Sequence, residues 1–225
     1  MTPDLRSRAT EPELLDEGVG EDETRKSLRD LQRVNRWLGG RRALRRAVEP
    51  FLGPGALLLD VGCGSADQPA WLFGRFPMRP PVGLDRKWLH VRQAPPSVRA
   101  VVGDVRALPF PPLSFDVVTV SLFLHHFDGD EVAAVLRSLF ALARRALVVN
   151  DLHRAQVPWL FARAVFPLVF ESAVSVADGL LSIRRSFRPD ELREAFRAAG
   201  LPTARVRRSF PYRLIAVAER NGRPS

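Results

Sequence analysis

Cysteine is nearly absent from this sequence, because Cys63 is its only cysteine among 225 residues. An internal disulfide and a zinc site built from cysteines are therefore excluded. Residues 1–23 are polar and acidic and lack the apolar core of a signal peptide, so we expect a cytoplasmic protein. The apolar stretch 157–181 is interrupted by charged residues and prolines, whereas a membrane span needs about 20 apolar residues. We therefore expect no membrane span.

Lysine is also scarce: Lys26 and Lys87 are the only two, although the formal net charge is +9. Arginines supply the remaining positive charge and are spread along the whole chain. A basic surface could bind nucleic acid. However, neither a lysine-rich tail nor a known nucleic-acid module accompanies the charge, so the pattern favours solvated helix faces. We do not expect a nucleic-acid partner.

An apolar run that ends in an acid and a glycine-rich turn is the most informative stretch. Residues 57–61 read as a strand buried on both faces, with Asp60 near its end. Gly62 and Gly64 then let a ligand approach the backbone closely, and Cys63 between them is a small filler rather than a nucleophile. A dinucleotide site would require a third glycine at residue 67, which is Asp67. Together with Asp60, the turn favours a nucleotide-like ligand that carries a cationic amino group.

Two further acids follow short apolar runs. Asp85 ends the run 82–85, and an acid about 20 residues beyond a glycine turn commonly binds ribose hydroxyls. Asp104 follows the run 98–102 in the same way. The chain then continues with alternating strand and helix patterns, which predict a parallel sheet with helices on both faces. We expect a helix over 69–76, and apolar spacing indicates earlier helices over 24–38 and 41–52.

Four elements, in the correct order and spacing, resemble one family. Asp60-x-Gly62-x-Gly64 is similar to the first motif of the class I S-adenosylmethionine (SAM)-dependent methyltransferases, with Ala66 in place of the third glycine. The segments 103–110 and 114–116 and the pair His125-His126 also resemble that family. The resemblance covers residues 54–218, and its branch is similar to the small-molecule methyltransferases of ubiquinone and menaquinone biosynthesis.

This resemblance implies an α/β, Rossmann-like, doubly wound seven-stranded sheet with a C-terminal antiparallel hairpin, N-terminal helices and a helical lid insertion. The acidic composition of residues 1–23 predicts a segment that is loose at first. We expect this segment and a helical cap over 1–53, followed by a SAM-binding domain over 54–220, in which the apolar insertion forms a lid at 155–185. Asp104 would accept the adenine amino proton and Val105 would cover the ring. The full set of implied cofactor residues is Asp60, Gly62, Cys63, Gly64, Asp85, Arg86, Asp104, Val105, Ser121 and Leu122.

The expected reaction is transfer of a methyl group from SAM to oxygen or carbon of a small, lipophilic or aromatic acceptor. His125, His126 and His153 are candidate bases, and the sequence does not single out one of them. Asp151-x-His153 lacks a third ligand, so we expect no metal. Two alternatives stay open, namely an RNA or protein methyltransferase and a non-catalytic binding subunit of the same fold. The sequence does not determine the oligomeric state.

Overall fold

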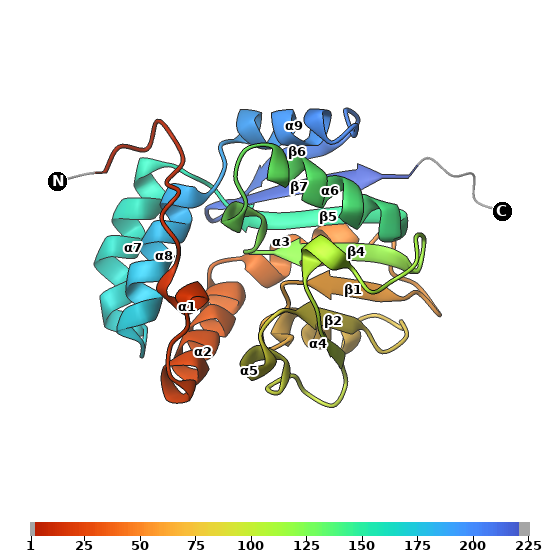
Figure 1. Cartoon of the computed structure of the whole chain (residues 1–225), viewed down its shortest axis with the longest axis horizontal. Helices are drawn as coiled ribbons and strands as arrows, with labels where there is room; N and C mark the ends of the chain where they lie inside the picture. The colour runs from red at the N-terminus through yellow and green to blue at the C-terminus, as the bar shows by residue number, and fades with distance from the viewer. Residues whose placement is uncertain (1–2, 221–225) are drawn as a thin grey trace.

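The computed structural model describes residues 3–220, and within them seven strands form one sheet in the order β3-β2-β1-β4-β5-β7-β6 (Figure 1). The strands β1 to β5 are parallel, whereas β7 runs antiparallel to both of its neighbours. This order confirms the doubly wound sheet with a C-terminal antiparallel hairpin. The strands are β1 (Leu58–Val61), β2 (Val82–Asp85), β3 (Arg99–Val102), β4 (Phe115–Ser121), β5 (Ala143–Leu152), β6 (Arg205–Ser209) and β7 (Arg213–Glu219).

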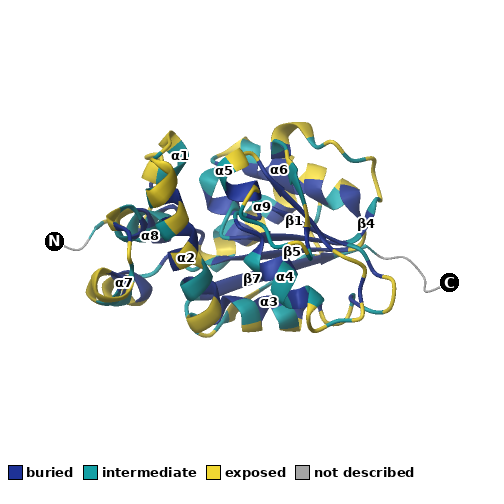
Figure 2. Ribbon diagram, turned by 90° about the horizontal axis from the view of Figure 1, so that it is seen from below, coloured by how far each residue is buried: buried dark blue, intermediate teal, exposed yellow. Residues whose placement is uncertain are grey.

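Helices cover both faces of this sheet (Figure 2). Leu44 of α3 packs with Leu58 on one face, and Leu136 of α6 packs with Val118 and Val149 on the other. The expected helix over 24–38 begins three residues earlier, and the one over 69–76 begins at Asp67. The helices are α1 (Leu14–Glu17), α2 (Glu21–Trp37), α3 (Gly40–Val48), α4 (Asp67–Phe73), α5 (Trp88–Val91), α6 (Asp130–Leu142), α7 (Gln156–Val169), α8 (Ala173–Arg185) and α9 (Pro189–Ala198), with 3-10 turns η1 (Val105–Ala107) and η2 (Leu124–His126).

A separate group of helices lies beyond the carboxyl ends of the parallel strands. Figure 1 shows α1, α2, α7 and α8 gathered there, at the left of the view. The insertion 155–185 forms α7 and α8, which share a small apolar core that includes Trp159, Phe166 and Ile183. Along residues 3–220, no helix combines the length and the apolarity that crossing a bilayer would require.

The beginning of the chain is not loose, in contrast to our expectation. The side chain of Leu5 is buried in the core of α7 and α8, and Glu13 is only 6% exposed. The buried guanidinium of Arg154 explains part of this order, because it donates hydrogen bonds to the carbonyls of Leu5 (3.1 Å) and Ser186 (2.5 Å) and pairs with Glu191. Composition alone could not indicate this, since the partners lie about 150 residues away in the sequence.

Asp60 at the end of β1 is directed into the sheet. Its Oδ1 accepts a hydrogen bond of 2.6 Å from the Thr119 hydroxyl of the neighbouring strand β4, and the residue is 3% exposed. Burial raises the pKa of this carboxyl to about 7, and the nearby Asp67 and Asp85 act in the same direction, against the opposing effect of Thr119. The group is therefore mainly protonated at mildly acidic pH.

Replacing Arg154 should destabilise the fold and release the beginning of the chain. We expect Arg154→Ala to lower the free energy of unfolding by about 3 kcal/mol, because buried carbonyls lose a charged donor. Urea unfolding would measure this loss, and limited proteolysis would report cleavage within residues 3–12. The control Arg46→Ala removes an exposed arginine from α3 and should change stability by less than about 0.5 kcal/mol. Equal stability of both variants would contradict the assigned role.

The raised pKa of Asp60 predicts a pH-dependent stability. Between its unfolded pKa near 3.9 and its folded pKa of about 7, the folded state binds more protons, so stability falls as pH rises. Asp60→Asn removes this penalty. From pH 5 to pH 8, we expect the variant to gain about 2 kcal/mol relative to the wild type in urea unfolding. Asp22→Asn, whose side chain is 93% exposed, should show no such trend. A parallel pH response of Asp60→Asn and wild type would refute this protonation.

Candidate functional site

A cavity of about 210 Å³ opens between the carboxyl edge of the sheet and the helices beyond it. Its wall contains most of the residues that the sequence singled out. Asp60, Cys63 and Ser121 do not line it, since they are buried within the sheet or the glycine turn. The predicted residues that do line the cavity are Gly62, Gly64, Asp85, Arg86, Asp104, Val105, Leu122, His125, His126 and His153.

The glycine turn after β1 adopts a backbone that only small residues tolerate. Gly62 has φ +68°, and a side chain there would begin 2.4 Å from the ring of Phe123. Ala66 also takes a left-handed conformation, with φ 57°, which a glycine would adopt at lower cost. Burial raises the pKa of the Cys63 thiol, which therefore stays neutral and fills space, as expected.

Asp85 joins the ends of β1 and β2. Its carboxylate accepts hydrogen bonds from the backbone N–H of Gly64 and of Lys87, each 2.9 Å, and lies 3.3 Å from Nδ1 of His90. Burial raises the pKa of Asp85, but His90 and the backbone donors outweigh this effect and hold it below its usual value. An anionic carboxylate thus faces the cavity beside the glycine turn.

Asp104 stands at the rim of the cavity, next to the buried side chain of Val105. One carboxylate oxygen accepts the backbone N–H of Arg106 at 2.9 Å and so begins the turn η1. The Asp104 side chain is 45% exposed, which leaves it free to bind another donor. The carboxylates of Asp85 and Asp104 and the apolar Val105 together line this end of the cavity.

His125 lies between two carboxylates. Its Nδ1 is 2.7 Å from Asp151 at the end of β5, and its Nε2 is 3.4 Å from Glu13, which precedes α1. Burial lowers the pKa of His125, but Asp151 and Glu13 outweigh it and raise the pKa to about 10. The backbone N–H of His125 also donates to Asp151, at 3.2 Å, so both the ring and the chain are fixed.

His126 stacks on His125, with ring centroids 4.5 Å apart, and makes an equivalent set of contacts. Its Nδ1 lies 2.7 Å from Asp16, and its Nε2 lies 3.8 Å from Glu13. Glu13 and Asp16 were missed by the sequence reasoning. They belong to an acidic segment without periodicity, more than 100 residues before the histidines, so no local signal could identify them.

His153 is not part of this cluster. Its neighbour Asp151 is directed towards His125, and the backbone N–H of His153 donates to Tyr212 at 3.1 Å. Burial lowers the pKa of His153, and the nearby guanidiniums of Arg208 and Arg188 lower it further. Its ring is therefore a neutral group on the wall of the cavity. The other end of the cavity is apolar and is lined by Phe161, Phe166, Phe170 and Ile183 of the insertion.

Comparisons with known proteins agree with this geometry. A family profile described as a methyltransferase domain matches residues 58–146. A demethylmenaquinone methyltransferase of Roseiflexus sp. strain RS-1 is 28% identical over 159 residues, which are 63% of this chain and 66% of that protein, slightly less than two thirds.

Two solved structures share the fold. A SAM-dependent methyltransferase from Aquifex aeolicus has a TM-score of 0.60 at 16% identity, covering 90% of this chain and 99% of that one. A chain from the complex of the Haloferax volcanii Trm112 activator with a methyltransferase has a TM-score of 0.62, at the same identity and coverage. Residues 58–146 therefore match a methyltransferase domain, and the chain has the fold of the class I S-adenosylmethionine-dependent methyltransferases.

Proposed function

We propose that this protein transfers a methyl group from SAM to oxygen or carbon of a small, apolar or aromatic acceptor. One observation carries the proposal: a single cavity joins the glycine turn and the acids of the sheet edge to the stacked pair His125 and His126 and to an apolar chamber. Both reactants can therefore meet in one enclosed space. The cytoplasmic location and the division at residue 54 stay predictions.

The residues at the sheet edge fit the cofactor. Asp85 is anionic and suits the ribose hydroxyls, while Asp104 and Val105 suit the amino group and the ring of adenine. Gly62 and Gly64 bring bare backbone to the wall of the cavity. Arg86 and Leu122 line the same cavity and complete this part of the proposal. When bound, SAM supplies a methyl group that is already activated by the positive charge on sulfur.

The protein must then orient the acceptor and exclude water. The aromatic side chains of Phe161, Phe166 and Phe170 favour an apolar molecule at the far end of the cavity. We place the acceptor hydroxyl beside His125 and His126, where its proton passes to the imidazole of His126 before methyl transfer, since His125 already carries a proton on both nitrogens. A role for His153 stays a prediction. The relative from Roseiflexus is named for a demethylated menaquinone, which supports an aromatic, quinol-like acceptor for this chain.

Calorimetry with SAM, followed by a labelled-methyl transfer screen, tests the proposal. We expect one SAM molecule to bind per chain, and label to pass from SAM to a phenol or quinol in preference to a carboxylic acid. NAD provides the control ligand and should not bind. Binding of NAD without binding of SAM would overturn the assignment.

Asp104→Ala should weaken SAM binding by roughly 1–3 kcal/mol, because a charge-assisted hydrogen bond to the cofactor is lost. Calorimetry would measure the change in Kd, and circular dichroism would show that the fold persists. Asp130→Ala, which removes an exposed aspartate outside the cavity, should leave the Kd unchanged. An unaltered Kd in Asp104→Ala would mean that adenine binds elsewhere.

A further inference from the structure

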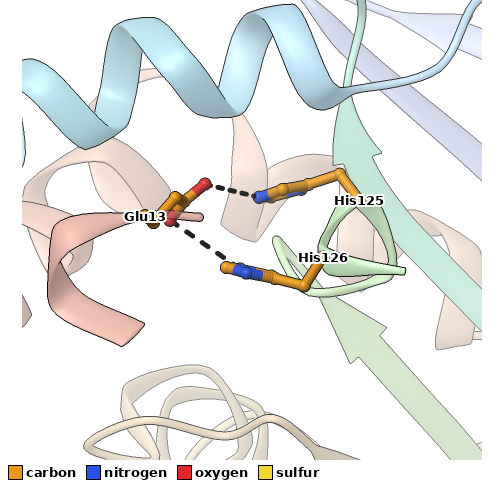
Figure 3. Close-up of side chains that lie close together, drawn as sticks. All are labelled: Glu13, His125 and His126. Carbon is orange, nitrogen blue, oxygen red and sulfur yellow. Dashed lines mark ion pairs between the residues drawn. The ribbon is translucent and has the colours of Figure 1, made fainter. Parts of the chain in front are cut away.

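Two imidazoles and one carboxylate converge on one point of the cavity (Figure 3). Nε2 of His125 and Nε2 of His126 face the two oxygens of Glu13, at 3.4 and 3.8 Å. One donor atom of each residue lies within 4.8 Å of the others. Bonds of about 2.0–2.2 Å from a tetrahedral zinc ion place its ligand atoms roughly 3.3 Å apart. Small side-chain movements would therefore bring these three donors around a single ion.

Each of the three side chains is held from behind by a second polar group. Nδ1 of His125 lies 2.7 Å from Asp151, and Nδ1 of His126 lies 2.7 Å from Asp16. A carboxylate beside Nδ1 retains the hydrogen there, so that a metal ion at Nε2 would take the place of the second imidazole proton. Glu13 in turn accepts a hydrogen bond of 2.6 Å from Ser182. Carboxylates behind histidine ligands are typical of metal centres.

The Nε2 atom of His125 provides an independent observation. It is buried, and among residues 3–220 it has no hydrogen-bond partner of good geometry, although Glu13 lies nearby. Three carboxylates, those of Glu13, Asp16 and Asp151, surround the two imidazoles. Arg86 and Lys87 pair with Asp16, whereas Glu13 and Asp151 face the imidazoles. A buried imidazole nitrogen without a hydrogen-bond partner in the described chain, beside these two carboxylates, favours a cation at this point.

We propose that Glu13, His125 and His126 bind one divalent metal ion, for which Zn²⁺ is the best match. Two histidines and one glutamate form the protein ligands of catalytic zinc sites, in which a fourth position stays open. Here the open position would face the cavity, since all three residues line it. The same ligand set also accepts Fe²⁺ and Co²⁺.

The role of the ion rests on the proposed function. The acceptor hydroxyl would bind at the open position through its oxygen, and its O–H bond would break, with the proton passing to solvent and the electron pair staying on oxygen. That oxygen, or a ring carbon conjugated to it, then takes the methyl group, and the sulfur of SAM keeps the electrons of the broken C–S bond. In the second case the methylated carbon loses its hydrogen as a proton, the C–H electrons restore the aromatic ring, and the oxygen takes up a proton. The metal thus replaces a histidine base by Lewis-acid activation of the acceptor.

Cobalt binding to the full-length, tag-free protein tests the site without any methyl transfer. After dialysis against a chelator, we expect Co²⁺ to bind once per chain and to give visible absorption typical of low-coordinate cobalt. Glu13→Gln and His126→Ala should each weaken binding by more than about 100-fold, beyond the loss typical of an outer partner. Circular dichroism would show that both variants are folded.

Two matched controls accompany these variants. Glu17→Gln makes the same change at an exposed position at the end of α1, the helix that Glu13 precedes, and His153→Ala removes a histidine from the same cavity wall. Both should bind Co²⁺ as the wild type does. Failure of the wild type to bind, or equal binding by Glu13→Gln and His126→Ala, would overturn the site and leave the cluster as a proton-holding network.

The metal's role is tested separately from the cofactor. Enzyme from which a chelator has removed the metal should bind SAM with an unchanged Kd. Its rate of methyl transfer should fall at least about 10-fold, and added Zn²⁺ should restore that rate. Full activity of the metal-free enzyme would refute Lewis-acid activation. If metal binds but SAM does not, the proposed function fails while the metal site stands.

Discussion

The buried carboxylate of Asp151 is the constraint on which the arrangement of the cavity depends. It lies near the end of β5 and is hydrogen-bonded to both the ring Nδ1 and the backbone N–H of His125. These two contacts connect the turn after β4 to the neighbouring strand β5. A buried charge is tolerated only when it is paired, so this contact can hardly shift. Because the His125 ring is fixed, His126 stacks on it and Glu13 contacts its Nε2. The contact with Glu13 holds the N-terminal segment beside the carboxyl edge of the sheet.

The sequence predicted those parts of the site whose signal is local. The strand that ends at Val61, the glycine turn and the acids Asp85 and Asp104 each depend on residues within one short stretch, and all lie where a parallel sheet brings its carboxyl ends together. The histidine pair was also identified, because it resembles the pair found at this place in the family. Ala66 shows the limit of this reasoning, since its left-handed backbone is imposed by the turn rather than by its own preference.

Long-range contacts decided what the sequence could not show. Glu13 lies beside His125, and Asp151 pairs with His125 rather than with His153, its neighbour in the sequence. Neither contact produces a pattern along the chain. Arginine is a second example. From the sequence we predicted that the many arginines lie on solvated helix faces. The buried Arg154 and Arg185 instead donate hydrogen bonds to backbone carbonyls and so hold the N-terminal segment against α8 and η2. The planar guanidinium, with five donors, can serve several carbonyls at once, which lysine cannot do.

The helices beyond the sheet come from two remote parts of the chain, residues 3–37 and 156–185, and they share one apolar core. Because side chains of the two parts bury one another, a change in the size of an apolar residue in one part alters the packing of the other. Remodelling the apolar end of the cavity would therefore require matched substitutions at the beginning and in the middle of the chain, whereas the strands of the sheet could stay as they are.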